Sequence, residues 1–462
     1  MCGITGIISF DNDSINFELL ESLFHIQHRG QDSVGICTFN KNKKYSLHKM
    51  GLVDNCFDEI HKLKGYMGIG QVRYPTSGNI TISEIQPFIS KNKNIAICHN
   101  GNISNYNELK NFGFNLKTSC DTEFILKFFE SKFKNIELIN ENMIIESIKE
   151  LSNICIGSYS IILMIKQFGL IAFKDPYGIK PLVYGNKNNK FILNSETVTL
   201  DCLNYSNMNE LGGGEIMIIN NNKPKIIKYS NEELKPCIFE WIYTQRAESI
   251  FYNVPIYEAR LKLGELLAYK IKNEIDINNI DYIIPIPDTS NPVAIKISEV
   301  LNIPYRDCIL KNRYIARTFI MDTQNNRGKT INRKFAVSKN IIENKNILIV
   351  DDSIIRGNTI KKIIELLNKN NVNKIYVVSC SPPVKYQNYY GIDIPTKEEL
   401  IINNKTIKEI EEHLKIEKLI YQDIDDMVES IKSINNSLNS FELSMFNGKY
   451  LNKKNITLRE SV

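Results

Sequence analysis

Continuous apolar runs in the second half of the chain set the strongest limit on its fold. Three such runs show little polar alternation, which is typical of strands buried on both faces of a sheet. Apolar residues recur at helical spacing before and between them. Strands that alternate with helices predict βαβ units, and therefore an α/β region with a parallel sheet covered by helices. The predicted strands are Ile283–Ile286, Ile347–Val350 and Lys374–Ser379, and the predicted helices are Glu258–Ile275, Asn291–Leu301 and Thr359–Asn368.

The first half has a different pattern, in which short apolar runs are separated by turn residues and a few helical stretches. Grouped strands with few helices predict an α+β layered sandwich. The change falls at Asn220–Pro236, a polar stretch with two prolines that is typical of a linker or crossover. We therefore expect two domains, at residues 2–235 and 236–462, and a polar helical tail at Thr396–Asn439. The expected strands are Gly3–Phe10, Val34–Phe39, Gly68–Arg73, Ile95–Cys98, Tyr159–Ile165, Leu170–Lys174, Phe191–Asn194 and Glu215–Ile219, with helices at Phe17–Ile26, Thr122–Phe133 and Met143–Asn153.

Composition excludes several classes of protein. A net charge of +5 over 462 residues is too small to indicate nucleic acid or an anionic membrane as partner. The start of the chain lacks the basic segment and cleavage site of a signal peptide, and no later apolar stretch is long enough to span a bilayer, so we expect a cytoplasmic protein. The ten cysteines contain no C-x-x-C pair and the six histidines do not cluster. This pattern argues against a disulfide framework and against a compact zinc site.

The stretch NILIVDDSIIRGNT at 346–359 carries a candidate phosphate site. A buried strand ends in Asp351 and Asp352, and a short polar loop then leads into an amphipathic helix. Ligands of parallel α/β sheets bind at the carboxyl ends of strands, where loop N–H groups and a helix N-terminus bind anions. The two carboxylates can hold ribose hydroxyls or Mg²⁺. The alternative is a helix-capping turn with two solvated acids.

A strongly basic stretch lies between the first two predicted strands of this half. Residues 311–335 contain seven basic side chains and a single acid, Asp322. Such a cluster is suited to neutralise a pyrophosphate leaving group, and binding of nucleic acid is the less favoured alternative. The sequence RGKT within it does not complete a P-loop, because Thr323 stands where that motif needs glycine.

These features of the second half resemble the type I phosphoribosyltransferases, which bind phosphoribosyl pyrophosphate (PRPP). The resemblance implies one Mg²⁺ per subunit, with Ser290, Asp351 and Asp352 as its candidate ligands. The equivalent of IIPIPDTSNP, at 283–292, contacts the pyrophosphate in that family. The residues implied to bind PRPP are Asp351, Asp352, Ser353, Arg356, Gly357, Asn358, Thr359, Asp288, Thr289, Lys311, Arg317 and Lys329.

Four short motifs follow the MCGI start in the first half. They read QHRGQDSVGI at 27–36, GQVRYPTSG at 70–78, HNGNISN at 99–105 and SCDTE at 119–123. Together they resemble the class II glutamine amidotransferases, which are N-terminal nucleophile hydrolases, and the resemblance covers residues 1–235. It implies that Met1 is removed and that Cys2 attacks the side-chain amide of glutamine. The alternative for Cys2 alone is a small residue at a frayed end.

The residues that this resemblance implies have the chemical groups that glutamine hydrolysis needs. A free α-amine has a pKa near ~8, against ~10.4 for lysine, so it can take the thiol proton at neutral pH. The resemblance implies that the Asn100 amide and the Gly101 N–H form the oxyanion hole. It also implies that Arg73, Asp121 and Arg29 bind glutamine, although Arg73 and Asp121 could each by itself be ordinary surface charge. Gln71 stands where the resemblance leads us to expect histidine or another small polar residue.

Both halves together resemble the amidophosphoribosyltransferase family. The resemblance implies the conversion of glutamine, PRPP and water to 5-phosphoribosylamine, glutamate and pyrophosphate, the first committed step of purine synthesis. It also implies inhibition by purine nucleotides and a homo-oligomer, either a tetramer or a dimer. The alternatives are another class II amidotransferase, such as glucosamine-phosphate synthase, and a non-catalytic PRPP-binding regulator. Residues TQRAES at 244–249 depart from the run that the family usually has there, and Gly328 and Asn332 stand where related loops often carry basic residues. These differences from the family bear on the reaction rate and on the response to inhibitors.

One branch of this family carries an iron–sulfur cluster on four cysteines. This chain keeps only Cys237 of that set, and the other three positions are occupied by Asn388, Glu442 and Met445. Because a cluster normally needs four thiolates, we expect no iron–sulfur cluster.

Overall fold

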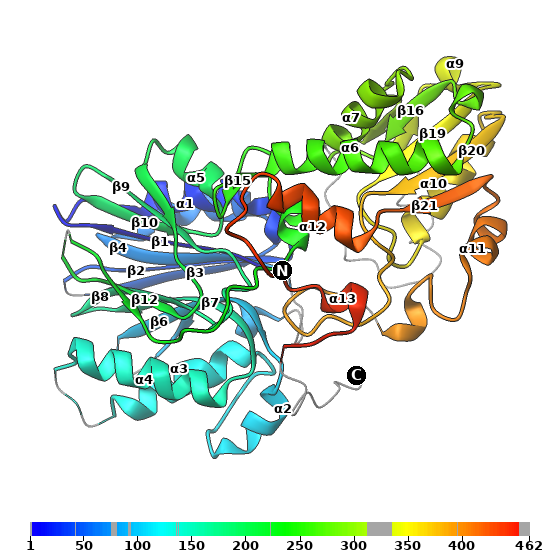
Figure 1. The fold of residues 1–462 in the computed structure, drawn as a ribbon. Coiled ribbons are helices and arrows are strands. Elements are labelled where there is room, and N and C mark those ends of the chain that lie inside the picture. The colour runs from blue at the N-terminus through cyan, green and yellow to red at the C-terminus, as the bar shows by residue number, and fades with distance from the viewer. Residues whose placement is uncertain are drawn as a thin grey trace.

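The computed structural model describes residues 2–41, 43–74, 81–90, 94–134, 136, 138–221, 223–311, 335–394 and 396–451. Figure 1 shows two regions, a layered sandwich built from the first half and a helix-covered sheet built from the second. The short helices α12 (Ile424–Lys432) and α13 (Ser444–Asn447) return from the end of the chain to lie between the two regions.

Two antiparallel sheets form the centre of the sandwich. The seven-stranded sheet has the order β11 (Ser206–Glu210), β9 (Val183–Lys187), β10 (Lys190–Asn194), β1 (Cys2–Ser9), β4 (Met67–Arg73), β2 (Ser33–Phe39) and β3 (Lys44–Met50). The six-stranded sheet has the order β13 (Lys225–Lys228), β12 (Glu215–Ile219), β8 (Gly169–Lys174), β7 (Gly157–Ile165), β6 (Ile95–Ile103) and β5 (Phe88–Ile89).

Successive side chains of a strand point to opposite faces of the sheet, and this alternation explains why the two sheets stack. In β1, Ile4 and Ile8 pack into the core between the sheets, whereas Ile7 packs outward under helix α1 (Asn16–His25). Helix α5 (Thr197–Cys202) covers the same outer face, and α3 (Asp121–Lys132) and α4 (Glu141–Ile154) cover the outer face of the six-stranded sheet. The result is the α+β sandwich that the sequence predicts.

The second region contains a four-stranded parallel sheet in the order β16 (Tyr282–Pro285), β19 (Asn346–Asp351), β20 (Lys374–Ser379) and β21 (Lys418–Tyr421). Leu348 and Val350 face one layer, and Ile347 and Ile349 face the other. The first layer is α6 (Ile256–Glu274), α7 (Asn291–Leu301) and α12, and the second is α10 (Asn358–Asn368) and α11 (Ile407–Leu414).

The topology of this sheet fixes where a ligand can bind. Tyr305 bridges to Ile283 in parallel, so the segment after α7 lies on the other side of β16 from β19. Successive crossovers from β16 and β19 therefore run in opposite directions. This is a topological switch point, and ligands of open α/β sheets bind at the carboxyl ends of the strands that flank it.

The remaining elements are short. A hairpin of β17 (Ile309–Lys311) and β18 (Phe335–Val337) brackets the basic stretch, of which residues 312–334 lie outside the described part of the chain. The others are α2 (Tyr106–Leu109), α9 (Lys339–Ile342), β14 (Ile250–Phe251), β15 (Val254–Pro255), 3-10 turns at Gln27–Arg29, Val53–Lys62, Ile82–Glu84, Lys110–Phe112, Ile277–Asn279 and Lys397–Glu399, and a π-helical turn at Glu240–Thr244.

Two expectations about organisation were wrong in part. The tail at Thr396–Asn439 is not only helical, because it contains the buried strand β21, whose four residues are too short to show a pattern next to charged neighbours. The stretch Asn220–Pro236 is not only a linker, because β13 within it pairs with β12 at the edge of the six-stranded sheet. An exposed edge strand is often polar, which conceals it in the sequence.

Candidate active sites

Cys2 begins β1 at one end of the sandwich and is largely buried. Its cross-strand neighbour on β4 is Arg73. The backbone nitrogen of Cys2 donates to Asn100 Oδ1 at 3.3 Å, and its thiol Sγ lies 3.8 Å from the carbonyl oxygen of Tyr74. The structure therefore brings together the predicted nucleophile and one of the two predicted oxyanion residues.

Asn100 and Gly101 lie on β6 of the opposite sheet. The Asn100 Nδ2 atom is buried and has no hydrogen-bond partner among the residues that the structure describes, so this donor is available to an incoming oxygen. Gly101 has a φ of 153°, and a Cβ atom there would lie 2.1 Å from the carbonyl oxygen of Ser158. Only glycine fits this position. The predicted strand ended at Cys98 because the polar residues after it are typical of a loop, whereas β6 continues to Ile103.

Arg73 and Asp121 are both buried. Arg73 Nη1 donates to the backbone oxygen of Glu84 at 2.9 Å, and Nη2 lies 3.4 Å from Glu84 Oε2. Glu84 in turn accepts from the backbone nitrogen and hydroxyl of Ser119, two residues before Asp121. Sequence reasoning missed Glu84, since it stands outside every motif and pairs with Arg73 only in the fold. Asp121 begins α3 and accepts from the backbone nitrogen of Ile103 at 2.9 Å.

Arg29 lies behind the nucleophile rather than in an open pocket. Its Nε donates to the carbonyl oxygen of Cys2 at 3.1 Å. Its other two nitrogens donate to Glu196 at 2.6 Å and to both carboxylate oxygens of Glu240 at 3.0 Å. In this structure Arg29 therefore holds the strand that carries Cys2, and binding of glutamine by Arg29 stays a prediction.

Asp351 and Asp352 end β19 at the switch point of the parallel sheet. Burial and the adjacent charge of Asp352 raise the pKa of the Asp351 carboxyl. Ser353 donates to Asp352 at 2.8 Å. Gly357, with a φ of 75°, precedes α10, and a Cβ atom there would lie 2.3 Å from Ile401 Cδ1. A strand, a tight polar loop and a helix N-terminus thus follow one another as predicted.

The turn after β16 meets the same edge of the sheet. Lys311 Nζ donates to Asp288 Oδ2 at 2.9 Å, so two predicted PRPP residues are paired across it. Thr289 is partly exposed beside them. The Ser290 hydroxyl is buried and donates to the Ile286 carbonyl at 2.6 Å, so a metal-binding role for Ser290 stays a prediction.

The other predicted PRPP residues divide into two groups. Arg356, Asn358 and Thr359 are exposed around the start of α10, and Arg356 Nε lies 3.5 Å from Glu399. Arg317 and Lys329 lie outside the described residues.

The described residues contain no group of three or more His, Cys, Asp and Glu side chains arranged to hold a metal ion. Asp351 and Asp352 do supply two adjacent carboxylates. Their mutual repulsion would be relieved by a divalent cation that a phosphorylated ligand also chelates.

Three of the four positions aligned with cluster cysteines lie together. Cys237 forms a parallel bridge with Glu442, and Asn388 Nδ2 donates to Glu442 Oε2 at 3.3 Å. Met445 is buried nearby on α13. Burial raises the pKa of the Glu442 carboxyl.

A segment of the second half rests on the strand that carries the oxyanion residues. The Tyr389 carbonyl accepts from Asn102 Nδ2 at 2.9 Å and from the Ser104 hydroxyl at 2.8 Å. The Ser158 hydroxyl donates to the Tyr390 carbonyl at 2.8 Å. The Tyr74 hydroxyl, beside Cys2, lies 3.3 Å from Asp393 Oδ2. The two halves of the chain therefore pack against each other beside the candidate glutaminase site.

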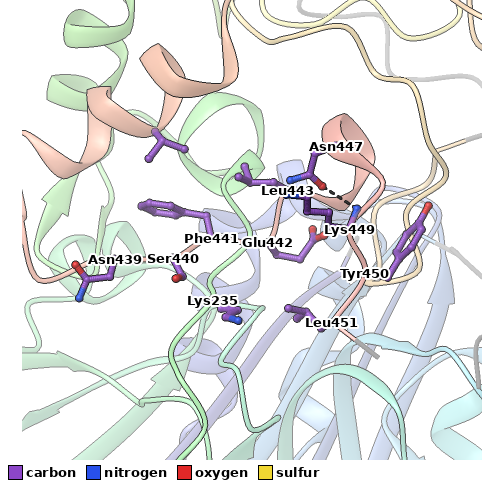
Figure 2. Close-up of a pocket in the computed structure, with 11 residues that line it drawn as sticks. Lys235, Asn439, Ser440, Phe441, Glu442, Leu443, Asn447, Lys449, Tyr450 and Leu451 are labelled. Carbon is purple, nitrogen blue, oxygen red and sulfur yellow. Dashed lines mark hydrogen bonds between the residues drawn. The ribbon is translucent and has the colours of Figure 1, made fainter. Parts of the chain in front are cut away.

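A cleft of about 440 Å³ opens near this boundary and is shown in Figure 2. Its walls come from Lys235 and from the segment around α13, including Phe441, Glu442 and Tyr450. None of the residues that line it belongs to either predicted site. Within the described ranges, no helix has the length and apolar character needed to cross a membrane.

Comparison with known proteins agrees with this geometry. A glutamine amidotransferase domain family matches residues 79–202, and a phosphoribosyl transferase domain family matches residues 255–411. The fold and the paired sites thus define a glutamine amidotransferase joined to a phosphoribosyltransferase.

Curated relatives and solved structures identify the combination. The chain is 36% identical to the amidophosphoribosyltransferase of Escherichia coli, over 98% of this chain and 93% of the relative. It is 33% identical to that of Saccharomyces cerevisiae, over 98% and 92%. The structure of glutamine PRPP amidotransferase from B. subtilis, complexed with ADP and GMP, matches with a TM-score of 0.86 and 30% identity, over 97% of both chains. The chain belongs to the amidophosphoribosyltransferase family and is a pentosyltransferase of purine synthesis.

Proposed function

We propose that this chain makes 5-phosphoribosylamine with Cys2 as its glutaminase nucleophile and with Asp351 and Asp352 in its PRPP site. The observation that carries the proposal is the pairing of Cys2 with Asn100, whose Nδ2 donor is buried and unpartnered. A buried donor without a partner is costly unless a ligand satisfies it. The oxyanion formed from a glutamine amide is such a ligand.

In the first half-reaction, the Cys2 sulfur attacks the side-chain carbonyl carbon of glutamine. The thiol proton passes to the α-amine that removal of Met1 exposes, and from there to the departing nitrogen. The carbonyl oxygen becomes negative and is held by Asn100 Nδ2 and the Gly101 N–H. Ammonia leaves, and water then cleaves the thioester to glutamate and restores the thiol.

Recognition of glutamine falls to Arg73 and Asp121. Arg73 presents a buried guanidinium to the substrate's α-carboxylate, and Asp121 presents a carboxylate to its α-ammonium. Glu84 positions Arg73 by accepting from it.

In the second half-reaction, ammonia attacks C1 of the ribose as the bond from C1 to pyrophosphate breaks. Asp351 and Asp352 hold the ribose hydroxyls, and the loop Ser353–Thr359 with the start of α10 holds the 5-phosphate. Asp288, Thr289 and Lys311 border the pyrophosphate. Asp351 and Asp352, with Ser290 as a further candidate, would hold Mg²⁺, which would supply positive charge opposite the pyrophosphate leaving group.

Four further properties belong to the proposal. Inhibition by purine nucleotides is supported by the B. subtilis relative, whose structure is complexed with ADP and GMP. A homo-oligomer rests on the family resemblance. A cytoplasmic location is supported by the ten cysteines, all of which are free thiols. Residues 2–235 are proposed as the glutaminase domain and 236–462 as the phosphoribosyltransferase domain.

A coupled assay tests the proposal. Purified protein is supplied with glutamine, PRPP and Mg²⁺, and glutamate, pyrophosphate and phosphoribosylamine are measured together. We expect equal amounts of the three products, and also synthesis from ammonium salt in place of glutamine. Glutamate release with no pyrophosphate under any condition would favour a different class II amidotransferase, and the absence of both would favour a non-catalytic regulator.

A further inference from the structure

Strand β6, which carries the oxyanion residues, extends beyond its neighbour β5. The pairing of the two strands ends at Ile97 within the described residues, whereas β6 continues to Ile103. Backbone groups of an antiparallel strand point alternately to its two sides. The nitrogen of Ser104 points towards β7, because it donates to the residue that precedes that strand. The backbone groups of His99, Gly101 and Ile103 therefore point to the side that β5 leaves open.

Side chains take the place of a strand partner along this open edge. The backbone nitrogen of His99 donates to Gln86 Oε1 at 2.7 Å, and its carbonyl oxygen accepts from Gln71 Nε2 at 2.7 Å. The backbone nitrogen of Ile103 donates to the carboxylate at the start of α3 at 2.9 Å. Gly101 lies between these two residues, so its N–H is the donor that the edge presents to a substrate.

The contacts with His99 fix the direction of both glutamine amides. A carbonyl oxygen can only accept, so Gln71 must turn its Nε2 atom towards it, and an N–H can only donate, so Gln86 must turn its Oε1 atom towards that group. The Gln86 Nε2 atom then donates to the Thr122 hydroxyl at 2.8 Å. Gln71 lies on β4 of the other sheet, so its bond to His99 spans the two sheets, and both glutamines are buried.

His99 directly precedes the two oxyanion residues, and its ring is held as well as its backbone. The Nδ1 atom lies 3.2 Å from Thr122 Oγ1, and Nε2 lies 3.4 Å from a carbonyl oxygen of β7. A Cβ atom at Gly101 would lie 2.7 Å from His99 Nε2, so the imidazole packs directly against this glycine. The contacts of His99 therefore determine where Asn100 and Gly101 lie relative to the sheet that carries Cys2.

Stabilisation of the sandwich does not by itself account for Gln71. Its Oε1 atom is buried and has no hydrogen-bond partner within the described part of the chain. Leaving a buried acceptor unpaired costs stability, and this cost opposes the gain from the bond to His99. Placement is a better explanation, because a displacement of about 1 Å in an active site can lower the rate by about 10²-fold.

We propose that Gln71 and Gln86 are positioning residues for the oxyanion hole, and that they act by holding the backbone of His99. This inference rests on the glutaminase function proposed above and adds two residues to it. Neither glutamine side chain touches the substrate in this role. Each one keeps the Asn100 and Gly101 donors where the oxyanion forms.

The proposed role predicts which kinetic constant changes. The α-carboxylate and α-ammonium of glutamine are assigned to Arg73 and Asp121, and these interactions are present before the reaction begins. The oxyanion exists only after Cys2 has attacked. Misplaced oxyanion donors therefore lower kcat and leave the KM for glutamine nearly unchanged.

The test replaces each glutamine by methionine, which has a similar length and no amide. We expect Gln71→Met and Gln86→Met to lower the glutamine-dependent kcat by about 10–100-fold. The KM for glutamine in Gln71→Met, and synthesis from ammonium salt in both variants, should stay near wild type. The matched control is Asn105→Leu, which should keep its kcat. Asn105 also holds one carbonyl and one N–H with a buried amide, but at Ile154 and Ile156.

Inhibition by L-glutamate γ-semialdehyde gives a readout that a general loss of stability would not change. The Cys2 thiol adds to the aldehyde carbon, forming a carbon–sulfur bond and a tetrahedral centre whose oxygen takes the position of the oxyanion. We expect Gln71→Met to raise the inhibition constant of this aldehyde by about the factor by which it lowers kcat.

A milder pair of variants applies if the methionine variants fold poorly. Gln71→Asn draws the amide back by one methylene group, whereas Gln71→His retains an N–H donor of the residue type that the family resemblance leads us to expect there. We expect Gln71→His to keep most of the wild-type kcat and Gln71→Asn to lose it. Equal activity of these two variants would overturn the proposal.

Three other results would also overturn it. These are a wild-type kcat in folded Gln71→Met, a defect of Gln71→Met that is confined to KM, and a loss in Asn105→Leu as large as in the glutamine variants. A parallel fall in ammonium-dependent synthesis would show that the role is general stability and would likewise overturn it. Absence of glutamine hydrolysis by the wild-type protein would instead count against the proposed function itself.

Discussion

The backbone nitrogen of Cys2 donates to the side-chain oxygen of Asn100 at 3.3 Å, across 98 residues of sequence. This bond joins strand β1 of one sheet to strand β6 of the other. It turns the Asn100 amide so that its oxygen faces the nucleophile's nitrogen and its Nδ2 stays free for substrate.

Replacing Asn100 by alanine tests that geometry. Loss of one oxyanion donor should lower the glutamine-dependent kcat by about 10²–10³-fold while ammonium-dependent synthesis persists. The matched control is Asn105→Ala, since Asn105 is also buried but bonds only to backbone at Ile154 and Ile156. Equal loss of kcat in both variants would contradict the assignment.

Cys2→Ala separates the two half-reactions. Without the thiol, glutamine should no longer be hydrolysed, whereas phosphoribosylamine should still form from ammonium salt, because Asp351 and Asp352 lie in the other half of the chain. Glutamate and pyrophosphate release are the measurements. A correctly folded variant that fails with both nitrogen donors would show that the sites are not separate.

Asp351→Asn and Asp352→Asn should behave in the opposite way. Each removes a carboxylate from the end of β19, so the KM for PRPP should rise whichever nitrogen donor is used. Basal glutamine hydrolysis without PRPP should change little. Initial rates over a range of PRPP concentrations decide the matter, and unchanged PRPP kinetics in both variants would exclude these residues from the site.

Glu196→Gln should weaken the fold in a pH-dependent way. Burial by itself would raise the pKa of Glu196, but the charges of His28 and Arg29 hold it at about 2, below the ordinary value of 4.5. Because the folded pKa is depressed, the stabilisation is present above about pH 4.5 and is lost as the pH falls towards 2, a contribution of roughly 3 kcal/mol.

Denaturant unfolding between pH 7 and pH 3 provides the measurement. The variant should be less stable at pH 7 and should lose less stability than wild type on acidification. Glu248→Gln is the control, since its ion pair with Arg246 is exposed and should contribute little. Parallel pH profiles for wild type and Glu196→Gln would contradict the prediction.

Purified protein should contain no iron and show no visible absorption. The position of Cys237 is surrounded by an amide and a carboxylate from Asn388 and Glu442, which are not cluster ligands. Elemental analysis after anaerobic purification checks this, and iron in proportion to protein would refute it.

Much of this fold could be predicted because its strands and helices have strong local patterns. Lys374–Ser379, Glu215–Ile219 and Asn291–Leu301 have the predicted bounds. Elements were missed where burial depends on distant partners. The end of β6 is polar, yet it is buried between sheets, and β21 is recognisable only beside β20.

Local motifs likewise predicted some residues of the candidate sites and missed those whose partners are distant in the sequence. The motifs of the first half predicted a shared role for Cys2, Arg73, Asn100 and Asp121, and the fold places Cys2 beside Arg73 and Asn100. Motifs could not show that Arg29 pairs with Glu196 and Glu240, because those residues lie 167 and 211 positions away. Nor could they show Glu84, which stands outside every motif and pairs with Arg73 only in the fold.

The salt-bridged group behind Cys2 has a consequence for protein engineering. If the two halves were separated, Arg29 would lose Glu240 and Glu240 would lose Arg29. Each would then be a buried charge without its partner, which is strongly destabilising. The glutaminase half therefore cannot be exchanged independently of the phosphoribosyltransferase half. A chimaera that takes its glutaminase half from another amidotransferase must therefore also carry the matching carboxylate.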